Sequence, residues 1–250
     1  MVNFVNFEKV DDKLLDTKVY RVYSLDKFLI SLNEKALYLI KPKLWDDPFE
    51  GFFLDQAFWV SDRGTKIHWI PDIDKERFYA QCWTLRNESD FLWRLYAPKK
   101  DGIMVRTTIR KLFNYLNEFP DNRYYIGKVE YLSKQEIRKK FSEIQKTQGL
   151  ENLIIDSLLI KRTEYREENE LRIICFSPDS SIPGEGPKGL YFPLAFDSYD
   201  KLLFEEIIID PRSNRMAFES TKRIIEALGY KGIILRSFLY DKPDFLIQIQ

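Results

Sequence analysis

The sequence predicts an α+β fold in which mixed, mainly antiparallel sheets carry flanking helices. Short runs of β-branched and aromatic residues outnumber the segments with helical periodicity. Few strictly alternating strand–helix–strand units occur, and a wholly parallel sheet would require them. Apolar residues make up 44% of the chain and aromatic residues 15%, which is enough to build a substantial core.

The elements follow from local patterns taken in chain order. VYRVYS (19–24) has the character of a short strand, and Ser24 can cap the amphipathic helix that follows it. Further strands are expected at 37–40, 78–84, 102–108, 124–132, 172–177, 190–194, 204–210, 231–238 and 244–250. Further helices are expected at 89–97, 108–119 and 217–228, and as a pair over about 133–162 with a break at Gly149. We therefore expect one domain over residues 1–250, with a helical insertion at about 133–163 and a flexible loop at about 178–189.

The net charge and the small numbers of cysteine and histidine residues limit the classes of function that this chain can have. Thirty-nine basic residues balance 39 acidic ones, so any contact with nucleic acid must come from a local patch. No stretch approaches the roughly 20 apolar residues that span a bilayer, and the start lacks the features of a signal peptide, so we expect a cytoplasmic protein without membrane contact. Two cysteines and a single histidine, His68, disfavour a disulfide framework, a histidine-based triad and a multi-histidine metal site.

The loop at 178–189 contains GEGPKG, which formally matches a dinucleotide-binding fingerprint. That fingerprint works between a strand and a helix whose N-terminus meets the pyrophosphate. Here two prolines interrupt the backbone and a strand-like LYFPL follows. The segment is better explained as a surface loop.

The first candidate binding group is Arg21 with Tyr20, Tyr23 and Ser24. An arginine in an aromatic strand can present a bidentate fork to a phosphate, and a neighbouring tyrosine can stack on a planar group. The alternative is an arginine on the solvent face of the strand.

The second candidate is CWTLRNESDFLWRLYA, in which Thr84 ends a strand and Trp93 and Tyr96 stand three apart on one helical face. A hydroxyl beside a helix N-terminus suits anion binding. The alternative for the aromatic pair is a place in the core, which is the commoner use of such a pair.

The third candidate is KRTEYREENELRIICF (161–176). If the strand begins near Glu168, then Glu168, Glu170 and Arg172 share one face. Two carboxylates at this spacing can hold a substrate hydroxyl and act on a nucleophile. The alternative is a solvated helix end that runs into the strand, with ion pairs of little weight.

WDDPFE (45–50) reads as a helix start, with Asp47 at the N-cap, Pro48 at the first helical position and Glu50 closing a capping box. This segment is therefore expected to be scaffold.

Together these motifs resemble the bacterial family called domain of unknown function 2971. The resemblance rests on YR near the start, KPKLWDDPFEG, CWTLRNESDFLWRLYA and the later pattern K-x3-Y-x2-E-x-E-x-R, and it extends from about residue 19 to about 236. WDDPFEG is its most specific element.

A more distant likeness connects the chain with ADP-ribosyltransferases of the Arg-Ser-Glu type, and it implies their fold and the use of NAD. It implies Glu170 as the catalytic glutamate, with Glu168 orienting the acceptor. It further implies that the dinucleotide is bound by Arg21, Tyr20, Ser24, Thr84, Trp93, Tyr96, Trp45 and Arg172. No metal is implied.

The resulting hypothesis is an ADP-ribosyltransferase-like enzyme that modifies a protein or nucleic acid, as a bacterial toxin or phage-defence effector with an antitoxin or regulatory partner. A non-catalytic module that binds a nucleotide or a partner is the first alternative. A metal-dependent nuclease or phosphodiesterase is the second, and it needs Asp47, Glu50, Glu168 and Glu170 to converge on one magnesium ion.

Overall fold

The computed structural model describes residues 1–45, 47, 49–50, 58–62, 65–69, 75–142, 150–177, 185–186, 189–196 and 202–242. The chain forms two compact units. Unit 1 comprises Met1–Val19, Leu37–Leu85 and Thr108–Pro193, and unit 2 comprises Tyr20–Ala36, Arg86–Thr107 and Leu194–Gln250.

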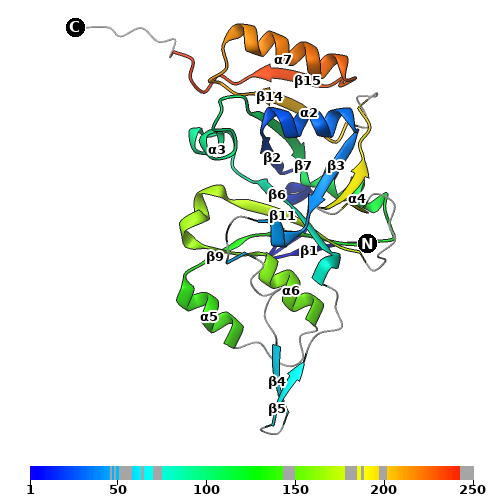
Figure 1. Ribbon diagram of the computed structural model, residues 1–250, viewed down its shortest axis with the longest axis vertical. Helices are drawn as coiled ribbons and strands as arrows, with labels where there is room; N and C mark the ends of the chain where they lie inside the picture. Colours follow the sequence, from blue (N-terminus) through cyan, green and yellow to red (C-terminus); the bar gives the residue numbers. More distant parts are fainter. Residues whose placement is uncertain are drawn as a thin grey trace, which may run out of the picture. The chain divides into compact units, whose positions relative to one another are not determined.

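Unit 1 is built on a mainly antiparallel sheet (Figure 1). Its strands are β1 (Val2–Val5), β3 (Ala36–Ile40), β6 (Phe78–Thr84), β8 (Arg123–Lys128), β11 (Glu170–Phe176), β12 (Glu185–Gly186) and β13 (Gly189–Pro193). The order is β1-β8-β11-β6, with β3 beside β6, β13 beside β3 and β12 beside β13. β11 runs antiparallel to both of its neighbours, whereas β1 and β8 are parallel. β11 is thus a central strand.

Helices and two small sheets complete unit 1. The helices are α1 (Asp12–Leu15), α4 (Ile109–Asn117), α5 (Lys134–Ser142) and α6 (Leu150–Leu158), with short 3-10 helices η1 (Pro42–Leu44), η3 (Lys75–Arg77) and η4 (Thr163–Glu168). β9 (Glu130–Leu132) pairs in parallel with β10 (Ile160–Arg162), and β4 (Phe58–Asp62) pairs antiparallel with β5 (Thr65–Trp69).

The core of unit 1 brings α6 against β6 and β11. Ile154 and Leu158 of α6 share one buried cluster with Phe78 and Ile174 of the two strands. Every residue of β11 is buried, including its charged ones, so the strand has no solvated face.

Unit 2 carries a second set of strands and helices. They are β2 (Lys18–Tyr23), α2 (Leu25–Asn33), α3 (Asp90–Tyr96), β7 (Ile103–Thr108), β14 (Glu206–Ile209), α7 (Arg215–Ala227) and β15 (Ile233–Arg236). The strand order is β2-β7-β14-β15, antiparallel between β7 and β14 and parallel between β14 and β15. Gly229 has a φ of 97°, which allows the left-handed turn that ends α7.

The expected fold class, α+β with mixed and mainly antiparallel pairing, is confirmed by these elements. The strand expected at 78–84 has the observed limits. The strand expected at 124–132 is divided into β8 and β9, and the helical stretch expected over 133–162 ends in a strand, β10. The strand expected at 244–250 lies outside the described residues.

The GEGPKG segment supplies two strands of unit 1. Glu185–Gly186 pairs antiparallel with β13, so a strand follows the last glycine of the motif. This arrangement confirms that the segment is no dinucleotide-binding fingerprint, because the fingerprint needs a helix at that point.

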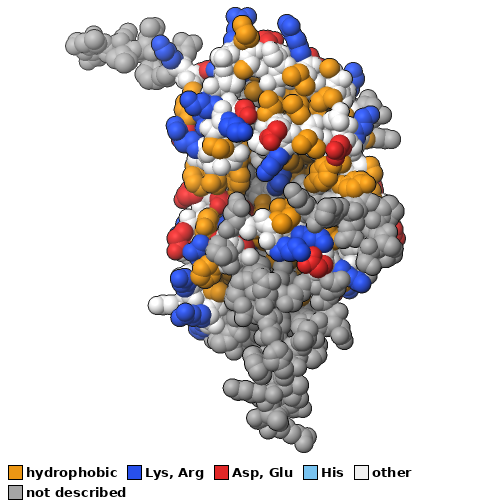
Figure 2. All heavy atoms as spheres, viewed as in Figure 1, with side chains coloured by type: hydrophobic (Ala, Val, Ile, Leu, Met, Phe, Trp, Pro, Cys, Tyr) orange, Lys and Arg blue, Asp and Glu red, His pale blue; other side chains and the backbone are white. Residues whose placement is uncertain are grey.

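The described surface is mixed in character. Figure 2 shows basic, acidic and hydrophobic side chains interspersed over this face, in keeping with the formal net charge of zero. Among the residues that the structure describes, no helix combines the length and the apolar character needed to cross a membrane.

Candidate functional site

The start of β11 places two glutamates beside the end of β6. Glu170 is paired with Thr84 in the antiparallel register, and the Thr84 hydroxyl donates to the backbone carbonyl of Glu168 at 2.6 Å. Asn169, between the glutamates, adopts a left-handed conformation with φ 44° and ψ 58°. Asparagine tolerates this region better than most residues. Glu168 therefore belongs to η4, and the strand begins at Glu170 rather than near Glu168 as expected.

Three carboxylates surround one buried ammonium. Lys161 Nζ lies 3.0 Å from Glu50 Oε1, 2.9 Å from Glu168 Oε2 and 3.1 Å from Glu170 Oε1. All four side chains are at most 7% exposed. Together with Arg172 they form a group that we call the carboxylate cluster.

Arg172 closes the cluster from the strand. Its Nε donates to Glu170 Oε2 at 2.7 Å, its Nη2 donates to Glu50 Oε2 at 2.5 Å, and its Nη1 donates to the carbonyl of Leu158 at 2.7 Å. The Trp45 ring lies over the guanidinium, 4.4 Å from centroid to Cζ. A buried guanidinium with this many acceptors is compensated for its loss of water.

The cluster holds Glu170 in its ionised form. Burial would raise the pKa of Glu170, but the Arg172 guanidinium and the Lys161 ammonium outweigh burial and lower this pKa to about 2. Burial would likewise lower the pKa of Lys161, yet the carboxylates of Glu170, Glu50 and Glu168 raise it. The pKa of Arg172 is also raised against the effect of burial, chiefly by Glu170.

These contacts show that the alternative for residues 161–176, in which the charged side chains are solvated, is wrong for Glu168, Glu170 and Arg172. Glu168 is 4% exposed, Glu170 3% and Arg172 0%. The physical reason is that the opposite charges in the cluster compensate for the lost hydration, which an isolated charge could not tolerate.

WDDPFE contributes directly to this cluster, contrary to the expectation that it is scaffold alone. Asp47 Oδ1 accepts from the backbone N–H of Phe49 at 3.0 Å, as a cap would. The Glu50 carboxylate instead reaches Arg172 and Lys161, because charge-assisted bonds to two buried cations are stronger than a bond to one backbone N–H. Residues 49–50 form a turn rather than a helix, and Asp46 and Pro48 lie outside the described residues.

Unit 2 holds the other expected binding residues. Tyr20 and Trp93 lie in its core with Leu92 and Met104, and Trp93 has no exposed surface. The Trp93 indole donates to Glu88 Oε1 at 2.6 Å. Trp93 thus has the position of a core residue, which was the alternative to a ligand platform.

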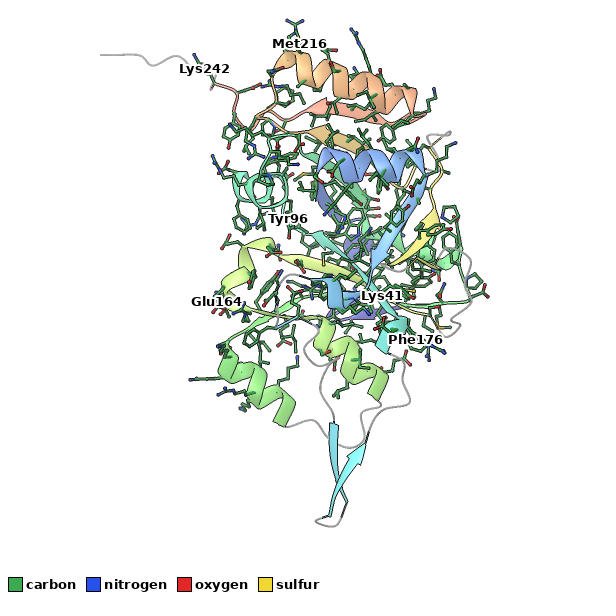
Figure 3. The ribbon with its side chains drawn as sticks, in the orientation of Figure 1. Lys41, Tyr96, Glu164, Phe176, Met216 and Lys242 are labelled. Carbon is green, nitrogen blue, oxygen red and sulfur yellow. The ribbon has the colours of Figure 1, made fainter. Side chains whose placement is uncertain are left out.

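The remaining expected residues of unit 2 lie nearer its surface. The Arg21 guanidinium lies over the Tyr23 ring, 4.9 Å from its centroid. Ser24 has the backbone conformation of an N-cap but makes no side-chain cap bond. Tyr96, at the end of α3, is 39% exposed and is labelled in Figure 3.

Sequence reasoning gave no role to Lys161, Arg162 or Tyr165. Arg162 Nη2 donates to Asp47 Oδ1 at 3.0 Å and to the Tyr165 hydroxyl at 3.1 Å. Lys161 and Tyr165 stand in the pattern K-x3-Y-x2-E-x-E-x-R, so the signal was present. The motif alone could not reveal these roles, because they depend on contacts with Asp47 and Glu50, which lie in a turn more than a hundred residues earlier in the chain.

The carboxylates of the nuclease alternative have other partners. Glu50, Glu168 and Glu170 surround the Lys161 ammonium, and Asp47 pairs with Arg162. Among the described residues, no group of histidine, cysteine, aspartate or glutamate side chains is arranged to hold a metal ion. The space between Glu50, Glu168 and Glu170 is thus occupied by the ammonium of Lys161, a residue of the chain itself.

Comparison with protein families gives a match over part of the chain. The model of the family described as "Protein of unknown function (DUF2971)" matches residues 92–173, which confirms the family resemblance expected from the motifs. Comparison with curated proteins gives no match.

Among solved structures, the chain is similar to DarT from Thermus sp. 2.9. The complex with NAD+ is 11% identical with a TM-score of 0.41, and the likeness covers 89% of this chain and 96% of that one. The complex with ADP-ribosylated ssDNA is 11% identical with a TM-score of 0.40, covering 89% and 94%. The complex with carba-NAD+ is 8% identical with a TM-score of 0.39, covering 89% and 96%. A likeness this distant says nothing about the activity of this chain.

Proposed function

We propose that this protein is an ADP-ribosyltransferase-like enzyme that uses NAD to modify a protein or nucleic acid, as a toxin or phage-defence effector. The observation that carries the proposal is the buried, ionised Glu170 beside Glu168 at the start of β11. The choice of NAD rests on the sequence likeness to ADP-ribosyltransferases of the Arg-Ser-Glu type.

The proposed reaction breaks the bond between the nicotinamide nitrogen and C1′ of the ribose, and nicotinamide leaves with the electron pair. Positive charge develops on the ribose, where the Glu170 carboxylate stabilises it. An oxygen or nitrogen of the acceptor bonds to C1′, and its proton passes to Glu168. Lys161 and Arg172 act as positioning residues, because each holds a carboxylate through charge-assisted bonds.

Contact with a ribose requires a rearrangement of the cluster. Glu170 is 3% exposed, and its two oxygens already accept from Lys161 and Arg172. A carboxylate has about four lone-pair positions, so capacity remains for a ribose hydroxyl. Glu50 lies in a turn rather than in a strand, and we expect its carboxylate to be displaced when the dinucleotide binds.

We propose a role for each of the other expected binding residues from the place where its side chain lies. We assign Arg21, with Ser24, to the dinucleotide phosphates, and Tyr20, which lies in the core of unit 2, supports this strand through packing. Because the Thr84 hydroxyl donates to the carbonyl of Glu168, Thr84 supports the glutamate pair. Trp93 acts through packing, and Tyr96, which is 39% exposed, has ring surface for contact with a ligand, whereas Trp45 is partly buried over the Arg172 guanidinium.

The test is release of nicotinamide from labelled NAD by the purified protein, with and without cell lysate as the source of acceptor. Glu170→Gln is expected to lower the rate by at least about 100-fold, because it removes the charge that stabilises the transition state. Glu219→Gln, an exposed carboxylate on α7, is the control and should leave the rate unchanged. Full activity of a folded Glu170→Gln protein would rule the assignment out. If that variant does not fold, Glu168→Gln supplies the same comparison for label transfer.

A non-catalytic binding module is a second candidate, and one observation favours it. Arg172 is completely buried, and Glu170 is nearly so, with partners for both of its oxygens. Buried charged groups whose hydrogen-bonding atoms already have partners within the chain are usual in structural ion networks. Binding of labelled NAD without nicotinamide release, with or without lysate, would support this candidate over the enzyme.

A further inference from the structure

A tyrosine hydroxyl beside the carboxylate cluster has no part in the proposed reaction. Tyr131 is the middle residue of β9, and in the parallel register it lies directly opposite Lys161 of β10. The backbone N–H of Glu170 donates to the Tyr131 hydroxyl at 2.8 Å. The short β9–β10 sheet therefore contacts Glu170 twice, through this hydroxyl and through the Lys161 ammonium.

The Glu170 N–H takes a side-chain acceptor because of its place in the sheet. Glu170 is the first residue of β11, and the pairing of β11 with β8 begins one residue later, with Leu171 opposite Lys128. Beyond the end of this ladder, the Tyr131 hydroxyl takes the place of a strand carbonyl. A buried backbone N–H is almost always paired, so the position of its acceptor constrains the path of the chain.

The backbone and the carboxylate of Glu170 are held by different kinds of group. The carboxylate accepts from Lys161 at 3.1 Å and from Arg172 at 2.7 Å. A lysine reaches its partner on a flexible four-carbon stem, whereas a tyrosine hydroxyl is carried on a rigid ring with two rotatable bonds. Tyr131 therefore restrains the Glu170 backbone more strictly than Lys161 restrains the carboxylate.

A neutral acceptor suits this position. The cluster already contains three carboxylates and two cations, and a carboxylate in place of the Tyr131 hydroxyl would add a fourth negative charge. Burial, first of all, and the neighbouring carboxylates raise the pKa of Tyr131 more than the Glu170 N–H and the Lys161 ammonium lower it. The hydroxyl therefore stays protonated and accepts the N–H without adding charge.

We infer that Tyr131 is a positioning residue, which holds the Glu170 backbone so that the carboxylate keeps one fixed place for the reaction at the ribose. A small misplacement of a reacting group can lower a rate strongly. Since Tyr131 acts through Glu170, its removal should affect the chemical step rather than substrate binding. The catalytic consequence rests on the proposed function, whereas the hold on the backbone does not.

The first experiment measures the kinetics of nicotinamide release. Tyr131→Phe keeps the ring and removes the acceptor, so kcat should fall by about tenfold or more while the KM for NAD changes by less than about twofold. A kcat equal to that of the parent protein would overturn the inference. A raised KM with an unchanged kcat would also overturn it, because that result indicates contact with the substrate.

Tyr115→Phe is the matched control. The Tyr115 hydroxyl donates to the carbonyl of Pro193 at 3.0 Å, so this variant also takes a hydroxyl partner away from a backbone group. Both tyrosines are partly buried. The control should change kcat by less than about twofold. Equal losses of kcat in the two variants would mean a general loss of stability and would overturn the inference.

The second experiment measures amide hydrogen exchange at single residues and needs no NAD. The Glu170 amide of the parent protein should exchange at least about 100-fold more slowly than an unprotected amide. Tyr131→Phe should speed this exchange by about tenfold or more and leave the amide of Ile173, in the middle of β11, unchanged. An unprotected Glu170 amide in the parent protein would overturn the inference, even if the variant does not fold.

Failure of this inference is distinguishable from failure of the proposed function. A parent protein that releases no nicotinamide removes the enzyme and the catalytic consequence, and exchange at Glu170 still tests the hold on the backbone. Nicotinamide release with an equal kcat in Tyr131→Phe keeps the enzyme and removes the positioning role.

Discussion

At the scale of the residue, Lys161 determines whether three carboxylates can stay buried together. Its ammonium lies within 3.1 Å of an oxygen of Glu50, Glu168 and Glu170. A carboxylate without a partner in such a place would become protonated or draw in water. Lys161 is therefore as important to this part of unit 1 as any apolar core residue.

Removing the ammonium should be costly. Lys161→Met keeps most of the side-chain volume and leaves the carboxylates facing Arg172 alone, so we expect the free energy of unfolding to fall by about 3–5 kcal/mol. Urea denaturation measures this loss. Lys128→Met, at an exposed lysine of β8, should change it by less than about 0.5 kcal/mol.

A second substitution shows whether charge is the cause. Glu168→Gln in the Lys161→Met background removes one of the uncompensated carboxylates and should restore part of the lost stability. No recovery in the double variant would mean that the lysine stabilises unit 1 through packing of its stem.

At the scale of the element, one residue sets the junction between η4 and β11. Asn169 has a positive φ of 44°, and its carbonyl accepts from the backbone N–H of Leu85 at 2.9 Å. This turn lets Glu168 and Glu170 reach the same ammonium although they stand on either side of a break in secondary structure.

Substitution of Asn169 tests the importance of this conformation. Asn169→Ala should destabilise the protein by about 1 kcal/mol, since a Cβ without a polar side chain is strained in the left-handed region. Asn169→Gly relieves that strain and should be close to neutral in thermal unfolding. Equal melting temperatures for the two variants would show that the backbone relaxes out of this region.

Elements were predictable where a local pattern decides them. The strand 78–84 has the β-branched and aromatic character of a strand, and Ser89 accepts from the N–H of Leu92 as the cap of α3. WDDPFE was misinterpreted because its local pattern is that of a capping box. The attraction of Arg172 and Lys161 for the Glu50 carboxylate outweighs that local pattern. Both cations are more than a hundred residues from Glu50 in the sequence, so the segment itself does not reveal these contacts.

At the scale of the whole molecule, the carboxylate cluster draws on segments that are far apart in the chain. Glu50 comes from the turn after η1, and Lys161 and Arg172 come from either side of η4. Sequence spacing could group the last two but could not show that Glu50 joins them. Convergence of this kind is a property of strand order, which no single motif encodes.

Stability towards acid should reflect this cluster. The pKa of Glu170 falls from 4.5 to about 2 on folding. A lowered pKa in the folded state means stabilisation that is complete above about pH 4.5 and is lost as the pH falls towards 2. We expect the free energy of unfolding to decline over that window, and denaturation at a series of pH values measures the decline.

Glu170→Gln is the matched variant, because it cannot titrate. Its unfolding free energy should depend less steeply on pH between about 4.5 and 2 than that of the parent protein. An unchanged slope would assign the acid sensitivity to other carboxylates.

The shared ammonium of Lys161 also bears on how such sequences can diverge. Because Lys161 contacts all three acids and Arg172 contacts two of them, the positions of K-x3-Y-x2-E-x-E-x-R and the glutamate of WDDPFE form a single set of interacting charges. A relative that has lost the lysine should also have lost one of the carboxylates. Substitutions at these positions are therefore expected to occur together, across more than a hundred residues of chain.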